Sequence, residues 1–400
     1  MLFEKITQAP PDAILGLTEA FKKDTNPGKV NLGVGVYVDD EGRTPVLRTV
    51  KESERRLIES EKTKSYLPIT GSPEYGSVVQ ELLFGADHPL LKANRVRTAH
   101  TPGGTGGLRV GAEFLKKFAP AATVWLSAPT WPNHKGIFAA AGFKTADYPY
   151  YDPGSHGLNA SAMLDALQKV PEGDVVLLHV CCHNPTGVDL DAGHWAEVAR
   201  IAAARRWIPF FDFAYQGFGA GIVEDRAGLA PISETGVDFL VSSSFSKNFG
   251  LYQDRVGALS IVAANNQAAD AAFSHIKTVV RVIYSNPPAH GGSVVTTILK
   301  DTALRMEWEK EVAGMRDRIA RVRRELVGGL SKRHAVMDFS FITRQKGMFS
   351  FSGLSDAQVA YLREKKSVYM VGGGRINVAG ITARNLDYTC DAIIEALQKA

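Results

Sequence analysis

The 400-residue sequence lacks the features that mark several classes of protein. Its three cysteines, of which Cys181 and Cys182 are adjacent, are too few for a disulfide framework. A formal net charge of +4 is too small to indicate a nucleic-acid partner. No apolar run approaches the roughly 20 residues needed to span a membrane, and MLFEKITQAP at the start lacks the pattern of a signal peptide. These absences favour a soluble cytoplasmic protein.

What is present is the composition of an ordinary soluble globular protein. Apolar residues make up 45% of the chain and charged residues 22%, and the length is enough for two domains. The start, through QAPPD and NPGK, is expected to form an arm with turns. We predict that residues 1–45 form this arm and part of a small domain, residues 46–310 a large domain, and residues 311–400 the rest of the small domain.

Four nearly continuous apolar runs predict neighbouring strands of one sheet. They span residues 122–129, 174–182, 207–215 and 237–245, and helical patterns such as residues 192–206 lie between them. Strands that are covered on both faces have continuous rather than alternating apolar residues. The β-α-β order predicts an α/β fold with a mostly parallel sheet flanked by helices.

The chain changes character after about residue 300. Apolar residues there recur every three or four positions, which predicts one long helix with a single buried face. They are Leu304, Trp308, Val312, Met315, Ile319, Val322 and Leu326. The shorter alternating segments FSFIT, MFSFSGL and RINVAGI and a last helical pattern follow, which together predict a smaller α+β domain.

Polar and aromatic residues gather at the downstream ends of the four apolar runs. Ligands of open α/β sheets bind beyond the carboxyl ends of the strands, so we expect these residues to meet at one site. They are Trp131, Asn184, Asp212, Tyr215, Ser244, Ser246 and Lys247.

Lys247 and Asp212 each allow two interpretations. Lys247 in SSSFSKNFG could be an ordinary surface lysine. In a poorly solvated site its pKa would fall, and the neutral amine could form a Schiff base with a carbonyl group. Asp212 could form a salt bridge or cap a helix, or it could present a fixed negative charge to a cationic ring.

A glycine cluster, TPGGTGGLRVGAEFLKKF at residues 101–118, precedes a helical pattern. Free backbone N–H groups at a helix start suit a phosphate group. The cluster matches neither the dinucleotide pattern G-x-G-x-x-G nor the P-loop. It therefore indicates either a single phosphate or only a tight turn.

The segment HVCCHNPTG offers His179, Cys181, Cys182 and His183 as possible metal ligands. We expect these side chains to alternate between the two faces of a strand, so that they cannot surround one ion. Core thiols and a packed histidine are the favoured interpretation, and no metal is predicted.

The combined pattern strongly resembles the class I aminotransferases of fold type I, which depend on pyridoxal phosphate. Bacterial aspartate and aromatic-amino-acid aminotransferases look most similar. The resemblance covers nearly the whole chain and rests on PDAILGL, KVNLGVGVY, YLPITG, PTWPNH, FDFAYQGF, SFSKNFGLYQDRVGALS, YSNPPAHG and GRINVAG.

The resemblance implies a role for each residue near the cofactor ring. Lys247 would hold pyridoxal 5'-phosphate covalently, and Asp212, supported by His134, would pair with the pyridine nitrogen. Asn184 and Tyr215 would bond the phenolic oxygen of the ring. A carboxylate beside the pyridine nitrogen keeps that nitrogen protonated, which makes the ring an electron sink.

The remaining implied contacts involve the ring face, the phosphate and the substrate. Trp131 would lie against the ring. Arg375 would bind the substrate α-carboxylate with Gly35 nearby, since an arginine fork matches a carboxylate. Arg281 from a second subunit would face a distal carboxylate, which implies a homodimer with shared active sites. The phosphate would be bound by Gly104, Thr105, Ser244, Ser246 and Arg255, joined by Tyr66 from the second subunit.

One segment departs from the family pattern. Relatives commonly carry Ala-Ser-Gly before the clamp arginine, whereas this chain has VGGGR. The run Gly372–Gly374 adds backbone freedom, which leaves open how firmly Arg375 is held and whether the small domain closes as in relatives.

The resemblance implies ping-pong transfer of an amino group between an L-amino acid and 2-oxoglutarate. Arg281 suits aspartate, whereas FGADHPLLK and YQGFGAG look more like aromatic-type relatives. We therefore expect an aromatic-amino-acid aminotransferase with aspartate activity, and a dedicated aspartate aminotransferase is the alternative. Two more distant alternatives are another reaction that depends on pyridoxal phosphate and a non-catalytic binding module on this fold.

Overall fold

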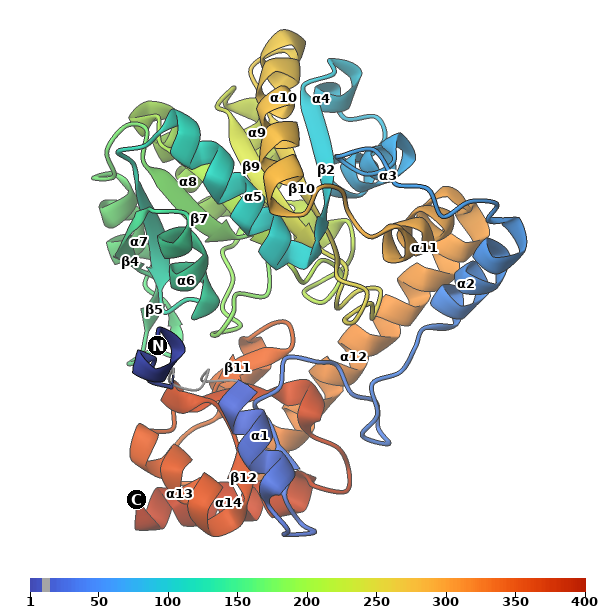
Figure 1. Cartoon of the computed structure of the whole chain (residues 1–400). Coiled ribbons are helices and arrows are strands. Elements are labelled where there is room, and N and C mark those ends of the chain that lie inside the picture. The colour runs from blue at the N-terminus through green and yellow to red at the C-terminus, as the bar shows by residue number, and fades with distance from the viewer. Residues whose placement is uncertain (9–14) are drawn as a thin grey trace. The chain divides into compact units, whose positions relative to one another are not determined.

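The structure is a computed structural model that describes residues 1–8 and 15–400 (Figure 1). The predicted turn at QAPPD and most of PDAILGL therefore lie outside the described residues. The chain divides into two compact units. The large unit comprises Thr44–Arg318 and Gln345–Gly347, and the small unit comprises Met1–Arg43, Ile319–Arg344 and Met348–Ala400. The predicted domain boundaries at residues 45 and 310 stay predictions.

A seven-stranded sheet forms the centre of the large unit, with the order β2-β10-β9-β8-β7-β3-β4. Only β10 among these strands runs antiparallel to its neighbours, so the predicted mostly parallel α/β sheet is confirmed. The strands are β2 (Val96–Pro102), β3 (Thr123–Ala128), β4 (Lys144–Pro149), β7 (Val175–His179), β8 (Ile208–Phe213), β9 (Phe239–Ser244) and β10 (Val256–Val262); β5 (Tyr151–Asp152) and β6 (Gly157–Leu158) form a separate hairpin.

Helices cover both faces of this sheet, which explains why its strands are apolar along their whole length. Phe210 of β8 belongs to the core beneath α5, α6 and α10, whereas the next residue, Phe211, contacts Trp195 of α8 on the opposite face. The helices are α2 (Arg48–Ser60), α3 (Pro73–Phe84), α4 (Pro89–Lys92), α5 (Gly103–Phe118), α6 (Asn133–Ala140), α7 (Ala160–Leu167), α8 (Ala192–Arg205), α9 (Leu229–Glu234), α10 (Asn266–Ile283) and α11 (Ala289–Lys300).

The long helix predicted after residue 300 is α12 (Thr302–Lys332), and the division between the two units falls within it. All seven apolar residues of its predicted stripe, from Leu304 to Leu326, are buried. Helix starts elsewhere are fixed by polar caps: Asp191 accepts the backbone N–H of His194 at the start of α8. None of the helices in the described part of the chain is both apolar and long enough to cross a membrane.

The small unit combines short strands with helices. Strand β1 (Val30–Asn31) pairs in parallel with β12 (Val368–Tyr369), and β11 (Phe349–Phe351) pairs antiparallel with β13 (Arg375–Asn377). Its own helices are α1 (Leu15–Lys23), α13 (Asp356–Lys366) and α14 (Leu386–Lys399).

The segment FSFIT does not extend as its alternating pattern suggested. Residues Ser340–Arg344 form a 3-10 helix instead. Asp338 accepts hydrogen bonds from the backbone N–H and the hydroxyl of Ser340, at 2.8 and 2.7 Å. This local bonding turns the chain at a place where an extended strand would need a neighbouring strand.

Candidate active site

Asp212 lies near the carboxyl end of β8, opposite His179 at the end of β7. Its Oδ2 atom is 3.0 Å from Nε2 of His134, which is fully buried. Burial alone would raise the pKa of Asp212, but the hydrogen bond and charge of His134, with Lys247 nearby, hold this pKa below its ordinary value. Asp212 is therefore a stable carboxylate in a poorly solvated place.

A chain of polar side chains continues behind His134. Thr130 Oγ1 lies 2.8 Å from His134 Nδ1 and 3.3 Å from His179 Nε2. The backbone N–H of Asn184 donates to Nδ1 of His179 at 3.4 Å. Burial lowers the pKa of His179 to about 3, so this imidazole stays neutral. The chain links the Asp212 carboxylate to the loop that carries Asn184.

Lys247 lies in a turn three residues after the end of β9. Its Nζ atom is 4.8 Å from the centroid of the Tyr215 ring. Burial lowers the pKa of Lys247 to about 8; the negative charge of Asp212 partly opposes this shift, and the positive charge of Arg255 adds to it. The amine thus becomes neutral far more readily than a surface lysine, as a nucleophile must.

Asn184 and Trp131 approach the same region from two other loops. Asp189 holds the Asn184 loop by accepting the backbone N–H groups of Cys182 and His183, at 2.8 and 2.9 Å. Trp131 meets the ring of His134 edge-on, with centroids 5.2 Å apart. The large unit thus gathers Lys247, Asp212, Tyr215, Asn184, Trp131 and His134 at the carboxyl ends of β3, β7, β8 and β9.

The start of α5 and the end of β9 form a polar cradle. Gly104 and Thr105 lie in the first turn of α5, where no side chain of the described residues caps the helix. Arg255 donates to Oγ of Ser246 at 3.4 Å, and the hydroxyls of Ser244 and Ser246 are 3.2 Å apart. Free helix N–H groups, hydroxyls and one arginine form the donor set that a phosphate requires.

Gly103 shows how closely this cradle is built. Its φ angle is +71°, and a Cβ atom there would lie 2.4 Å from Nη2 of Arg255. A side chain would therefore displace the guanidinium, so the glycine keeps both the turn and the arginine in place. With Lys247 and Asp212 nearby, the donor set fits a molecule that carries a phosphate, an aldehyde and a basic ring nitrogen.

In the small unit, Arg375 of β13 is almost fully buried, with 3% of its surface exposed. Its Nη2 donates to the backbone oxygen of Gly33 at 2.8 Å, and its guanidinium lies 4.3 Å from the centroid of the Phe349 ring. A Cβ atom at Gly35 would lie 3.3 Å from the tip of the same ring. Arg375 and Gly35 thus share Phe349 as a neighbour.

The glycine run before Arg375 is anchored. Gly373 and Gly374 have φ angles of +73° and +78°, which glycine adopts without strain. The backbone N–H and hydroxyl of Ser352 both donate to the oxygen of Gly374, at 2.9 and 2.8 Å, and the N–H of Gly373 donates to Asp356 at 2.8 Å. The extra backbone freedom expected here is thus restrained by these bonds, whereas closure of the small domain stays an open expectation.

Tyr66 and Arg281 differ from the other predicted site residues because both lie on the surface of the large unit. The side chain of Tyr66 is 92% exposed. Arg281 lies near the end of α10, is exposed, and donates to the hydroxyl of Ser285. The structure therefore does not gather these two residues into the buried group around Lys247.

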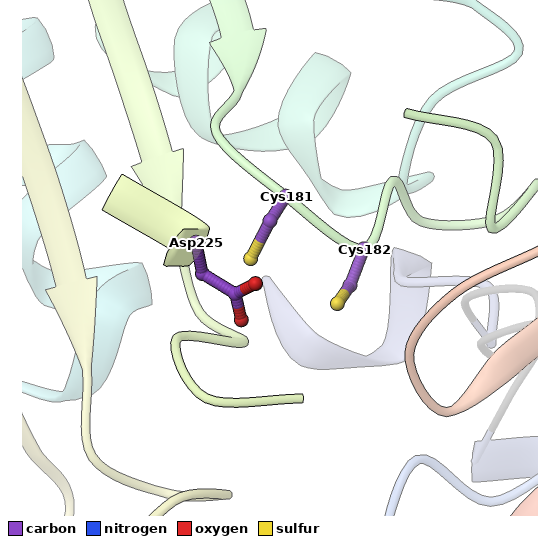
Figure 2. Close-up of side chains that lie close together, drawn as sticks. All are labelled: Cys181, Cys182 and Asp225. Atoms are coloured by element: carbon purple, nitrogen blue, oxygen red, sulfur yellow. The ribbon is translucent and has the colours of Figure 1, made fainter. Parts of the chain in front are cut away.

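The expected alternation of the HVCCHNPTG side chains between the two faces of a strand is wrong. Strand β7 ends at His179, and Cys182 is left-handed with a φ angle of +52°, so the four side chains do not alternate along a strand. The two thiols instead lie near Asp225 (Figure 2). Asp225 already accepts four backbone N–H groups, and burial raises the pKa of Cys181 well above its ordinary value. These features favour a structural cluster.

Sequence reasoning missed Thr130 and Asp189. Thr130 directly precedes Trp131 in PTWPNH, and Asp189 follows NPTG by two positions, so both stood beside motifs already selected. Thr130 contacts His134 and His179, and Asp189 holds the loop that carries Asn184. These contacts depend on the pairing of His179 with Asp212 in the sheet, which the sequence does not show.

The comparisons with known proteins agree with this geometry. The family model for aminotransferases of class I and II matches residues 27–393. The aspartate aminotransferase of Escherichia coli is 52% identical over 99% of this chain and 100% of its own length. The aromatic-amino-acid aminotransferase of Pseudomonas aeruginosa is 46% identical over 98% of each chain.

Solved structures give the same result. The aromatic-amino-acid aminotransferase of Burkholderia pseudomallei, covalently bound to pyridoxal phosphate, is 48% identical and superposes with a TM-score of 0.97 over 99% of this chain and 100% of its own. The resemblance predicted from the sequence is confirmed: the chain belongs to the class I and II aminotransferases.

Proposed function

We propose that the protein is a pyridoxal-phosphate-dependent aminotransferase that moves an amino group between an L-amino acid and 2-oxoglutarate. The observation that carries this proposal is that a buried amine and a buried carboxylate lie close enough for the charge of each to shift the pKa of the other. Lys247 has a pKa near 8, and Asp212 stays ionised through His134. Family membership and the covalent pyridoxal phosphate of a relative 48% identical support it.

Four groups of this chain, besides Lys247, would hold the cofactor. Pyridoxal phosphate, when bound, supplies an electron sink for the carbanion at the substrate Cα. Asp212 would keep the ring nitrogen protonated, and the chain from His134 through Thr130 would keep Asp212 ionised and oriented. Asn184 and Tyr215 would bond the phenolic oxygen, Trp131 would cover the ring face, and the cradle would bind the phosphate through Gly104, Thr105, Ser244, Ser246 and Arg255.

Lys247 would act twice. It would first attach the cofactor through its amine. Once the substrate amine has displaced it, the freed amine would take the proton from Cα of the substrate and deliver it to C4′ of the cofactor within the same half-reaction. In the second half it would move a proton in the reverse direction, from C4′ to Cα of the new amino acid. A lysine with a pKa near 8 suits both steps because its neutral and charged forms are both accessible near neutral pH.

Arg375 would bind the α-carboxylate that all amino acid substrates share. Its guanidinium fork matches a carboxylate bidentately. The contacts with Gly33 and Phe349 fix the side chain before any substrate arrives, which lowers the entropy cost of binding.

We infer a homodimer with shared active sites. Tyr66 and Arg281 are exposed in this chain, and the resemblance assigns them to the site of a second copy, where Tyr66 would join the phosphate and Arg281 would face a distal carboxylate. A cytoplasmic location stays a prediction from the sequence. Sedimentation of the purified protein tests the dimer, and a monomer that is fully active would contradict it.

The substrate is expected to be an aromatic amino acid, with aspartate also accepted, and a dedicated aspartate aminotransferase is the alternative. Relatives named for each activity match nearly the full chain, with identities of 52% and 46%. Measuring kcat/KM for aspartate, phenylalanine and tyrosine with 2-oxoglutarate separates the two. Comparable values for all three support the aromatic enzyme, and turnover of aspartate alone supports the alternative.

A further inference from the structure

We propose that Trp308 of α12 is a positioning residue for Lys247, acting through the backbone that follows the lysine. The proposal rests on the proposed function, because it concerns the position of the Lys247 amine that would carry the cofactor. Trp308 belongs to the buried stripe of α12, and its side chain has no exposed surface. It makes two contacts with the pair of residues that directly follow Lys247.

The first contact is a hydrogen bond and the second is a ring stack. The indole Nε1 of Trp308 donates to the backbone oxygen of Asn248 at 2.7 Å. The indole also stacks on Phe249, with ring centroids 4.4 Å apart and planes inclined by 18°. The Trp308 side chain thus restrains both residues after the lysine: Asn248 through its backbone oxygen and Phe249 through its ring.

A second tie joins the same turn to the residues that follow Tyr215. The Asn248 side chain donates to the backbone oxygen of Gln216 at 3.3 Å. The Gln216 side chain in turn donates to the backbone oxygens of Leu82 and Ile222, at 3.1 and 2.9 Å. The lysine turn is therefore attached to the segment that presents Tyr215, whose ring faces the lysine amine.

These ties matter because β9 ends at Ser244. Beyond that residue one more backbone bond, from Phe245 N to Val256 O at 3.0 Å, ties the chain to β10, and Lys247 then lies in a turn whose own closing bond, from Gly250 N to Lys247 O, measures 3.1 Å. A misplacement of about 1 Å in a reacting group can cost about a hundredfold in rate. The indole bond supplies the restraint that the strand no longer gives.

Trp308→Phe tests the proposal because it keeps an aromatic ring for the stack but removes the N–H donor. Trp207→Phe is the matched control: Trp207 is 1% exposed, and its Nε1 has no hydrogen-bond partner among the residues that the structure describes. The control thus removes similar buried volume without removing a bond. Both variants are loaded with pyridoxal phosphate, and the absorption band of the bound cofactor is titrated with pH.

We expect Trp308→Phe to shift the midpoint of this titration and to lower kcat by about tenfold or more, equally for aspartate and phenylalanine, because the amine is displaced. Trp207→Phe should leave both quantities near those of the unmodified enzyme. If Trp308→Phe matches Trp207→Phe in midpoint and kcat, the proposal is overturned.

Phe249→Leu keeps the test decisive if Trp308→Phe fails to fold. It removes the ring on which the indole of Trp308 stacks and should move the midpoint in the same direction, whereas an unchanged midpoint would overturn the proposal. An unmodified enzyme with neither a cofactor band nor transamination would instead overturn the proposed function itself, and with it the role of Trp308.

Discussion

Two arginines that we assign to carboxylate binding are held in opposite ways. Arg375 is buried in the small unit, bonded to Gly33 and stacked on Phe349. Arg281 is exposed near the end of α10. The first would bind the carboxylate that every amino acid carries, and the second would bind a group that only some substrates carry. By our assignment, the common group would be recognised by a residue buried within one unit of the chain. The variable group would be recognised by a residue that is exposed on the single chain and supplied to the site of a second copy.

The group around Lys247 extends this comparison to chemistry. Hydrogen bonds link Asp212 to His134 and, through Thr130 and His179, to the loop of Asn184, so a change there should affect every substrate. Changes at Arg281 should instead separate substrates.

Lys247→Ala should abolish transamination of every substrate while leaving the fold intact, because it removes both the attachment point and the base. Turnover with aspartate and with phenylalanine, together with the circular dichroism spectrum, checks this expectation. Lys92→Ala, which changes an exposed lysine of the same unit, serves as the control. Retained turnover in Lys247→Ala would remove the lysine from the mechanism.

Asp212→Asn should lower kcat by about a thousandfold or more for all substrates, because a neutral amide does not keep the ring nitrogen protonated. Single-turnover rates with aspartate and with phenylalanine measure the effect. A loss of less than about tenfold would mean that another group stabilises the charge.

Arg281→Leu should lower kcat/KM for aspartate by about a hundredfold, because the distal carboxylate loses a charge-assisted partner. Phenylalanine should be affected by less than about threefold. Steady-state kinetics with both substrates measure the ratio. Equal losses would place Arg281 outside substrate recognition and would end the contrast with Arg375.

Ser352→Ala should give the smallest effect. It removes one of the two hydrogen bonds from Ser352 to the oxygen of Gly374, which are worth about 1 kcal/mol each. We expect KM to rise by about fivefold for aspartate and phenylalanine alike, with little change in kcat, because both share the α-carboxylate. Ser340→Ala, whose hydroxyl bonds Asp338 in the same unit, is the control. A KM change for only one substrate would contradict this role.

The parts of the fold that follow from periodicity could be predicted from the sequence. Four continuous apolar runs became β3, β7, β8 and β9, and the stripe from Leu304 to Leu326 became the buried face of α12. These patterns are local consequences of burial on both sheet faces or on one helix face. The polar residues downstream of these runs, Asp212, Asn184 and Lys247, lie at or beyond the carboxyl ends of the strands, as predicted.

What could not be predicted depends on contacts between distant residues. FSFIT forms a 3-10 helix because Asp338 accepts a hydrogen bond from the backbone of Ser340. Cys181 and Cys182 do not continue the strand before them because the backbone of Cys182 is in the left-handed conformation. The glycine run before Arg375 looked loose in the sequence, but bonds from Ser352 and Asp356 restrain it. Each outcome was decided by partners that periodicity does not identify.

The central claim is that the amine of Lys247 carries pyridoxal phosphate. The purified enzyme, loaded with the cofactor and reduced with borohydride, can be digested and its peptides sequenced by mass spectrometry. Our account predicts one cofactor-modified peptide, the one that contains SFSKNFG, with the added mass on Lys247. An active enzyme whose added mass lies on a different lysine, or on none, would contradict it.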